Sequence, residues 1–438
     1  QRYSSAAELR DALVGVQNKL ASTSALQQKS QRFLQRSRRH LRGIGLAAGI
    51  VALAAVGLLA ARGAFRARAE SSPAAAATAA TEVLSVVVLP LENFTGEATY
   101  FVDGMTDGII SALARLGNLR VISRQSAMHY KGSTKLLPDI AKELGVGYCL
   151  EGTIVREHGQ VQFAVQLIQP APQEKQVLVR TFRRAESEIL ALHDEVALAI
   201  AKSLRVEMSG SEALQLTRSR VLNPEAYDAY LQGGELVDRM TTAEAFQDAI
   251  AKLERAVELE PQFAAAWAAL ADTLMIQGYL FSDPQAAHVK ADLAVRRALE
   301  ADPKSAEAHV ASGYLLHFYD WDWPSAEREY RRGLELNPNL APGHQRLWAL
   351  LEAQGRHEEA GREIARALLL DPLSPNINAN QAVHWMVIGD YEKARTQLDF
   401  ATSRWPDDAA VRLYLCQLLA VSRGSHAETR SALREMAK

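Results

Sequence analysis

The sequence predicts a multidomain protein in which a single transmembrane helix precedes an α/β domain and an all-α solenoid. Three observations lead to this prediction. Residues 43–61 are all apolar or glycine, residues 83–206 mix β-branched runs with amphipathic stretches, and residues 222–438 carry a pattern that recurs about every 34 residues. At roughly 100–200 residues per domain, the 438 residues suffice for several units, and a hydrophobic fraction of 48% allows each unit its own core.

The composition excludes several classes of protein. The formal net charge is −2 at pH 7, which excludes a chain that is basic throughout and binds nucleic acid by charge alone. The two cysteines, Cys149 and Cys416, cannot form a disulfide framework or a four-cysteine zinc site. We expect both to be buried as small apolar residues.

Residues 1–42 form the first predicted segment. The string RYSSAAELRDAL, residues 2–13, has apolar residues at helical spacing and resembles the closing segment of bacterial serine/threonine protein kinase domains. This resemblance implies that a kinase catalytic domain ends just before or within the segment. The sequence itself contains none of the kinase catalytic motifs. We therefore interpret residues 1–42 as a cytoplasmic juxtamembrane helix, in a chain that is a piece of a longer protein.

The run GIGLAAGIVALAAVGLLAA, residues 43–61, predicts a transmembrane helix. As an α-helix it is about 28 Å long, close to the ~30 Å of a bilayer core. The alternatives are a buried soluble helix and a signal peptide, which would not follow a long charged segment. Basic residues number six before the run and three after it, so we expect a cytoplasmic amino terminus. The predicted localisation is a single-pass inner or plasma membrane protein whose residues after 61 are extracytoplasmic, with residues 62–82 as an alanine-rich linker.

Residues 83–206 alternate strand and helix signals. The order of the expected elements is strand, helix, strand, helix, three strands and a final helix, which predicts a mixed sheet covered by helices. The first strand, VLSVVVLPL, is a nearly continuous apolar run that fits burial on both faces. Residues 160–167 alternate apolar and polar side chains, which predicts a half-buried antiparallel strand. Residues 189–204 carry apolar side chains at helical spacing.

This stretch resembles the TolB amino-terminal-like domain of bacterial membrane signalling proteins. The resemblance is carried by VVVLPLENFTGE, residues 86–97, by residues 100–132, and by IAKELGVGYCLEGTIVREHGQV, residues 140–161. It implies an α/β module without catalytic activity.

No motif in residues 83–206 predicts catalysis. Asp103-Gly104 and Asp107-Gly108 lack the spacing of a calcium loop, and we expect them to cap the start of a helix. His193 and Asp194 are neighbours on one expected helix and so point to different faces. We therefore predict no catalytic, cofactor-binding or metal-binding residues.

Residues 222–438 repeat a helix-pair signature. A proline closes each unit and small residues stand twelve and five positions before it. The prolines are Pro261, Pro303, Pro338, Pro372 and Pro406; the small residues are Ala249, Ala291, Ala326, Ala360 and Ala394, then Ala256, Ala298, Gly333, Ala367 and Ala401. This pattern resembles the tetratricopeptide repeat, with Gly355 and Gly389 at the turns within repeats. The resemblance implies a curved solenoid whose concave face binds a protein or peptide.

One aromatic cluster is a candidate ligand-binding rim. It consists of Phe318, Tyr319, Trp321 and Trp323, within the string FYDWDW. The alternative interpretation is a turn insertion whose rings pack between repeats.

Together these features predict the non-catalytic sensor or protein-interaction portion of a membrane-anchored signalling protein. The resemblance at residues 2–13 favours a serine/threonine kinase as its effector. A winged-helix regulator or a nucleotide cyclase carrying the same sensor, and an envelope scaffold without signalling output, are the alternatives. The oligomeric state, the ligand and any kinase substrates have no signature in the sequence.

Overall fold

The computed structural model describes residues 84–93, 96, 98–216, 221–238 and 242–421. The predicted juxtamembrane helix, transmembrane helix and linker lie outside these residues, as does the kinase-like string. Within the described ranges, no helix has both the length and the apolar character needed to cross a bilayer. The predicted localisation as a single-pass membrane protein is therefore contradicted. The solenoid helices Ala243–Leu259, Trp323–Leu336 and His357–Leu370 are amphipathic and carry charged residues on their outer faces, which a bilayer core would not solvate.

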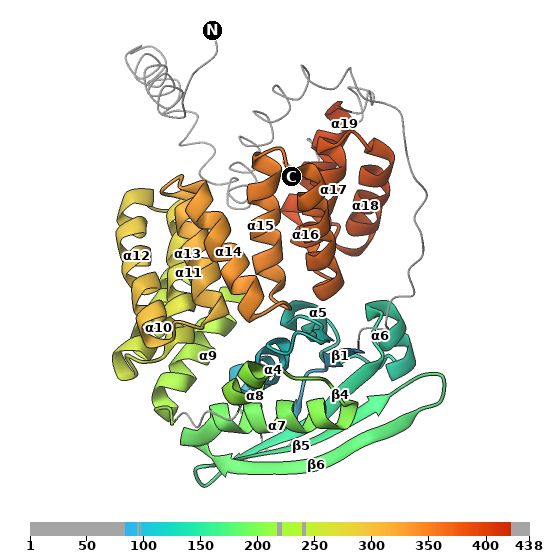
Figure 1. Ribbon diagram of the computed structural model, residues 1–438, viewed down its shortest axis with the longest axis vertical. Coiled ribbons are helices and arrows are strands. Elements are labelled where there is room, and N and C mark those ends of the chain that lie inside the picture. Colours follow the sequence, from blue (N-terminus) through green and yellow to red (C-terminus); the bar gives the residue numbers. More distant parts are fainter. Residues whose placement is uncertain (1–83, 94–95, 97, 217–220, 239–241, 422–438) are drawn as a thin grey trace.

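The described residues form a mixed α/β unit below a helical solenoid (Figure 1). The six described strands order as β3-β1-β4-β5-β6, with β2 pairing to β4. Strand β1 runs parallel to β3 and β4, whereas β4, β5 and β6 form an antiparallel meander. The strands are β1 (Leu84–Val88), β2 (Glu92–Asn93), β3 (Leu119–Val121), β4 (Tyr148–Glu157), β5 (Gln160–Gln169) and β6 (Lys175–Ala185).

Two predictions about these strands are confirmed. Val86, Val87 and Val88 in β1 have no exposed surface, as expected for a strand buried on both faces. Along β5 the apolar side chains turn inward in alternation with half-buried neighbours. Cys149 and Cys416 are both buried, and burial raises the pKa of the Cys149 thiol to about 12.

Helices α4 and α7 pack against each other in the α/β unit. Its helices are α4 (Thr99–Ala114), α5 (Arg124–Met128), α6 (Leu137–Leu144), α7 (Ile189–Leu204) and α8 (Gly210–Gln215). The expectation that Asp103-Gly104 and Asp107-Gly108 cap a helix start is wrong, because α4 begins at Thr99 and both pairs lie inside it. Their glycines serve close packing instead. A Cβ at Gly104 would lie 2.3 Å from Leu231, and one at Gly108 would lie 2.2 Å from the His193 ring.

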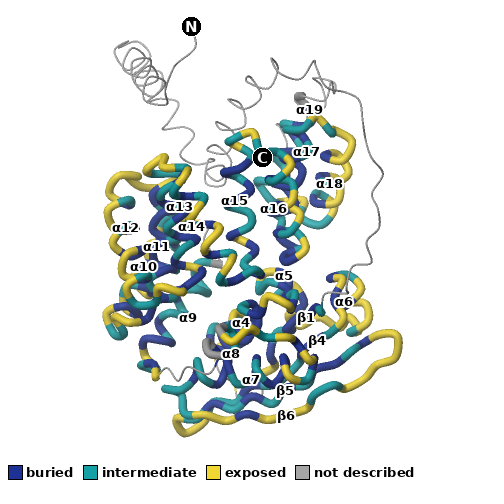
Figure 2. The backbone as a smooth tube through the Cα atoms, viewed as in Figure 1, coloured by how far each residue is buried: buried dark blue, intermediate teal, exposed yellow. Residues whose placement is uncertain are grey.

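The remaining helices form a tetratricopeptide-like solenoid of antiparallel pairs. The pairs are α9 (Pro224–Asp238) with α10 (Ala243–Leu259), α11 (Ala264–Leu280) with α12 (Pro284–Ala301), α13 (Ala306–Phe318) with α14 (Trp323–Leu336), α15 (Ala341–Ala353) with α16 (His357–Leu370), and α17 (Pro375–Val387) with α18 (Tyr391–Arg404). Helix α19 (Ala409–Val421) follows the fifth pair. The outer faces of the second helices are exposed, while the inner helices carry the core (Figure 2).

The small residues predicted to let paired helices approach are buried in every pair. The five alanines twelve positions before each proline have no exposed surface, and neither do the four alanines five positions before it. Gly333 takes the fifth such place, where a Cβ would lie 2.7 Å from Val310. The register read from the prolines is therefore confirmed.

For four of the five repeat prolines, the residue six positions later donates a side-chain hydrogen bond to the proline's carbonyl. The bonds are Trp267 Nε1 to Pro261 O at 3.0 Å, His309 Nε2 to Pro303 O at 3.1 Å, His344 Nε2 to Pro338 O at 3.1 Å, and Asn378 Nδ2 to Pro372 O at 3.0 Å. Each bond ties the first helix of a repeat to the turn before it. This pattern could not be predicted from the sequence, because different residue types occupy the position.

His309 makes one of these bonds pH-dependent. Its Nε2 faces the Pro303 carbonyl and its Nδ1 lies 2.7 Å from Glu329, so both ring nitrogens face acceptors and the doubly protonated ring suits them best. The hydrogen bond to Glu329 raises the pKa of His309, against burial and the nearby Arg332 charge. A raised folded-state pKa gives stability that is complete below the unfolded pKa of about 6.5 and is lost as the pH rises through the folded pKa.

We therefore expect His309→Asn to lower the free energy of unfolding by about 1 kcal/mol below pH 6 and by less above pH 7. Asparagine can still reach the proline carbonyl, as Asn378 does two repeats later. Urea melts of both proteins across this pH range measure the difference. Glu329→Gln should remove the same pH dependence, and a difference that grows with pH would contradict the assignment.

Candidate functional site

The α/β unit docks on the loops that join successive repeats of the solenoid. Asn339, in the loop after α14, directs its Nδ2 at the carbonyls of Ala114, Leu116 and Leu119 at 2.8–3.3 Å. Its Oδ1 accepts the backbone N–H of Val121 at 3.2 Å. One buried side chain thus bridges the solenoid to the end of α4 and to β3.

The next repeat loop makes a second contact with the α/β unit. Ser126 on α5 donates through Oγ to Asp371 at 2.5 Å, and the same Oγ accepts the backbone N–H of Leu373 at 2.9 Å. The backbone N–H of Ser123 bonds the Leu370 carbonyl at 2.8 Å. Because these bonds join two successive repeats to one sheet edge, they fix the α/β unit against the solenoid (Figure 1).

A cavity of about 760 Å³ lies where the two units meet; we call it the junction cavity. Helices α4 and α7 of the α/β unit form one wall, and the first helices of four successive repeats, α9, α11, α13 and α15, form the other. Small side chains keep the α11 side open, among them Ala265 and Ala269, one turn apart. A volume in this range suits a small ligand or a few residues of a peptide.

Two ion pairs hold cations in the walls of the junction cavity. Arg346 on α15 meets Asp272 on α11 through two hydrogen bonds of 3.0 Å each. Burial alone would lower the pKa of Arg346, but the Asp272 carboxylate outweighs it and holds the pKa above its ordinary value. Arg115, the C-cap residue of α4, pairs with Asp194 on α7. Both guanidinium charges are thus matched within the walls.

Three aromatic rings form a cluster in the wall of the junction cavity. The centroids of Tyr230 and Phe263 lie 4.9 Å apart, and Tyr227 lies 6.2 Å from each of them. Tyr227 and Phe263 are buried, whereas Tyr230 is half-buried. Burial raises the pKa of Tyr230, and the nearby carboxylates of Asp107 and Glu307 raise it further.

His193 stands in the α7 wall as an uncharged ring. It is 3% exposed, it stacks on Phe163 with centroids 5.8 Å apart, and its Nε2 has no hydrogen-bond partner. Burial lowers its pKa to about 3, with help from the Arg115 charge. Within the described residues, no group of three or more histidine, cysteine or carboxylate side chains is placed to hold a metal ion.

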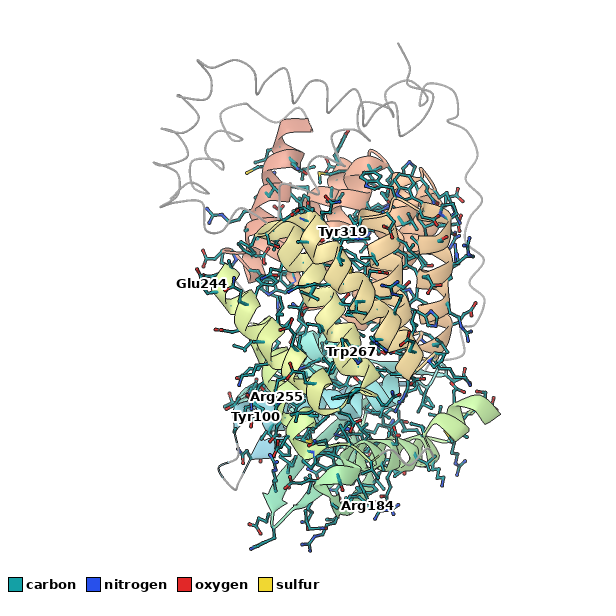
Figure 3. All side chains as sticks on the ribbon, turned by 90° about the vertical axis from the view of Figure 1, so that its left-hand side faces the viewer. Tyr100, Arg184, Glu244, Arg255, Trp267 and Tyr319 are labelled. Carbon is teal, nitrogen blue, oxygen red and sulfur yellow. The ribbon has the colours of Figure 1, made fainter. Side chains whose placement is uncertain are left out.

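The predicted aromatic rim lies away from the junction cavity, in the turn between α13 and α14. Tyr319 donates its hydroxyl to the Met275 carbonyl at 2.6 Å, and Figure 3 shows it far from the sheet. Phe318 packs on Tyr314 at 4.7 Å, and Trp323 is half-buried. Trp321 is 62% exposed and stacks on Trp323 at 6.2 Å. Only Trp321 of the four presents most of its surface to solvent, and the rim as a ligand site stays a prediction.

Trp321 occupies the position that glycine holds in the next two repeats. Gly355 and Gly389 each lie seventeen residues before the following proline with φ of 77° and 84°, which confirms their predicted place in the turns. Trp321 stands at the same place with φ of 59°. A bulky residue in the left-handed region costs on the order of 1–3 kcal/mol.

We therefore expect Trp321→Gly to raise the free energy of unfolding by about 1 kcal/mol, because glycine adopts this conformation without strain. Trp321→Ala is the matched control, since it removes the ring and keeps the strained backbone, and it should not stabilise the chain. Thermal melts of the three proteins measure the effect. If both substitutions raised the stability equally, the destabilisation would come from the indole ring and not from the strained backbone.

The comparisons with known proteins cover parts of the chain. No family model matches it. A curated protein described as putative adenylate cyclase 3 of Rhizobium meliloti (strain 1021) is 34% identical over 189 residues, which span 42% of this chain and 32% of that protein. The chain thus matches about a third of the length of that relative.

Solved structures with similar folds include tetratricopeptide-repeat proteins. PilF of Pseudomonas aeruginosa is 22% identical, with 48% of this chain and 89% of that chain covered and a TM-score of 0.36. A thermophilic repeat protein of Thermus thermophilus is 20% identical, with 45% and 100% covered and a TM-score of 0.37.

Proposed function

We propose that this chain is the non-catalytic interaction portion of a signalling protein and that a partner peptide binds in the junction cavity. The observation that carries the proposal is that the α/β unit and four successive repeats line one cavity together. An occupant there touches both units at once. Its binding would therefore favour the docked arrangement, which gives the module a way to report the presence of a partner.

The identity of the effector is a finer part of the proposal. The string at residues 2–13 favours a serine/threonine kinase, whereas the 189-residue match favours a nucleotide cyclase as the protein that uses this module. The match is longer, so we place the cyclase first. The coding sequence that adjoins this segment tests the choice: cyclase catalytic motifs in the same reading frame would support it, and an A-P-E motif followed by kinase-like helices would favour the kinase.

Filling the junction cavity should abolish peptide binding. Ala269 is half-buried in the α11 wall, and Ala269→Trp would place an indole in the space that an occupant needs. Peptides selected from a random display library on the wild-type chain should bind Ala269→Trp at least about ten-fold more weakly, because the lost contacts are worth over ~1.4 kcal/mol.

Ala286→Trp is the control, because Ala286 is exposed on α12 and does not line the cavity. It should leave the affinity of every selected peptide unchanged. Titration calorimetry on the three proteins, with melting curves to verify folding, gives the comparison. If no selected peptide distinguishes Ala269→Trp from the wild type, the junction cavity is not the binding site.

A further inference from the structure

The aromatic cluster of the junction cavity has the composition of a receptor for a cation. Tyr227, Tyr230 and Phe263 bring three ring faces or edges within 6.2 Å of one another, and the most accessible of them is Tyr230. A Lys or Arg head group placed on such rings gains most when it is desolvated, as it would be inside a cavity. The carboxylates of Asp107 and Glu307 act electrostatically on Tyr230, and Arg124 acts in the opposite sense, so a cation on this ring lies close to two negative charges and one positive charge.

The charges that line the junction cavity favour the same occupant. Among its described lining residues, six are carboxylates and three are lysine or arginine. Arg115 and Arg346 are matched by Asp194 and Asp272 within the walls. Asp107 and Asp302 also interact with other groups of the chain, so they do not count toward this excess. Of the described lining residues, this leaves the carboxylates Glu260 and Glu307 against the cation Lys304. An acidic peptide would meet net repulsion here, and a basic one net attraction.

The buried histidine in the α7 wall does not oppose a cation. His193 is 3% exposed and uncharged at neutral pH, so it adds no positive charge to the cavity. Its Nε2 is itself buried and has no hydrogen-bond partner. Both walls are therefore compatible with a positively charged occupant.

We propose that the junction cavity binds a basic peptide, with a Lys or Arg side chain seated on the cluster of Tyr227, Tyr230 and Phe263. This inference rests on the proposed function and adds the chemical class of the partner. The carboxylates around the cavity select the peptide for charge, and the rings hold the head group of one side chain. A partner segment rich in arginine or lysine satisfies both features, whereas an acidic or neutral segment satisfies neither.

The test uses the full chain and three matched probe peptides. One is an acetylated, amidated peptide with arginines spaced by glycine and serine, the second carries citrulline in place of arginine, and the third carries glutamate. Citrulline keeps the shape of arginine without its charge. We expect the arginine peptide to bind at least about ten-fold more tightly than the citrulline peptide, and the glutamate peptide not to bind.

Two substitutions locate the binding within the junction cavity. Glu307→Gln removes a negative charge from an exposed side chain. It should lower the affinity for the arginine peptide several-fold while the fold stays intact. Tyr230→Leu should lower this affinity about ten-fold, with a melting curve to verify folding. Glu358→Gln, on the outer face of α16, is the charge-matched control and should leave the affinity unchanged.

The outcomes separate this inference from the proposed function. Equal binding of the arginine and citrulline peptides, or arginine binding that Ala269→Trp and Glu307→Gln leave intact, overturns the basic-peptide inference. So does a set of library peptides that Ala269→Trp excludes but that carries no excess of lysine or arginine; in that case the junction cavity still binds peptides and the proposed function stands. If no peptide of any class responds to Ala269→Trp, the proposed function fails, and the inference fails with it.

Discussion

Replacing Asn339 with aspartate should lower the free energy of unfolding by about 3 kcal/mol or more. The substitution preserves the shape of the side chain, but it turns the Nδ2 donor into a carboxylate oxygen. That oxygen would then face the carbonyls of Ala114, Leu116 and Leu119, which the amide now approaches within 3.3 Å. Asn339 is 5% exposed, so water cannot replace the lost hydrogen bonds without opening the contact between the two units.

Melting curves of the full chain measure this effect. Because Asn339 joins the α/β unit to the solenoid, we expect Asn339→Asp to melt in two steps where the wild type melts more cooperatively. Asn118→Asp is the matched control: Asn118 also donates through Nδ2 to a backbone carbonyl, that of Glu207 at 2.9 Å, but it is exposed. It should cost less than about 1 kcal/mol. If the two substitutions cost the same, Asn339 does not hold the interface.

The parts of the fold that depend on local pattern could be predicted from the sequence. The apolar run at Val86–Val88 indicated a strand buried on both faces, and the recurring prolines fixed the register of the small residues Ala360 and Ala394. In each case the pattern lies within one element or repeats at a fixed interval. Burial then follows from the period, so no knowledge of a distant partner is needed.

The docking of the two units could not be predicted, because its residues also belong to the repeat signature. Asn339 and Asp371 lie in the loops around Pro338 and Pro372, where a polar residue is expected as a turn or cap. Their partners lie 218–245 residues away in the chain. Nothing in the local sequence distinguishes a loop that faces solvent from one that binds a sheet edge.

The junction cavity escaped prediction for a related reason. Its open space depends on alanines, which are common in the helices of such repeats and give no separate signal. Its paired charges, Arg346 and Asp272, lie 74 residues apart in the chain. The available signal was Tyr227 and Tyr230, whose spacing of three places both on one helix face. The sequence drew attention instead to the aromatic string at Phe318–Trp323, of which Tyr319 is committed to a hydrogen bond with the preceding repeat.

The glycines of α4 show the same limit at the scale of one residue. Gly104 and Gly108 stand next to aspartates, so the local sequence indicated turn chemistry. Their role is set by Leu231 and His193, which approach too closely for a Cβ. Such a requirement is visible only once the opposing helices are in place.

Replacing Ala360 with phenylalanine should destabilise the solenoid by about 3 kcal/mol, at the upper end of the usual range for overpacking. Ala360 has no exposed surface and belongs to a core shared by the last repeats. A phenyl ring there must displace a neighbouring helix, because Ala360 is fully buried and α16 packs against both α15 and α17. Since each repeat packs only on its neighbours, the misfit would pass to α17 as well.

The comparison is with Glu358→Ala, two positions earlier on the same helix. Glu358 is exposed, so its loss should change the free energy of unfolding by no more than about 0.5 kcal/mol. Both variants differ from the wild type by one residue in the first turns of α16, so a difference between them reflects burial rather than helix propensity. Thermal melts of the full chain by circular dichroism measure it. If Ala360→Phe melted at the wild-type temperature while Glu358→Ala melted at a lower one, the buried face of α16 would be assigned wrongly. The register that places the first helices of the repeats along the junction cavity would then be wrong as well.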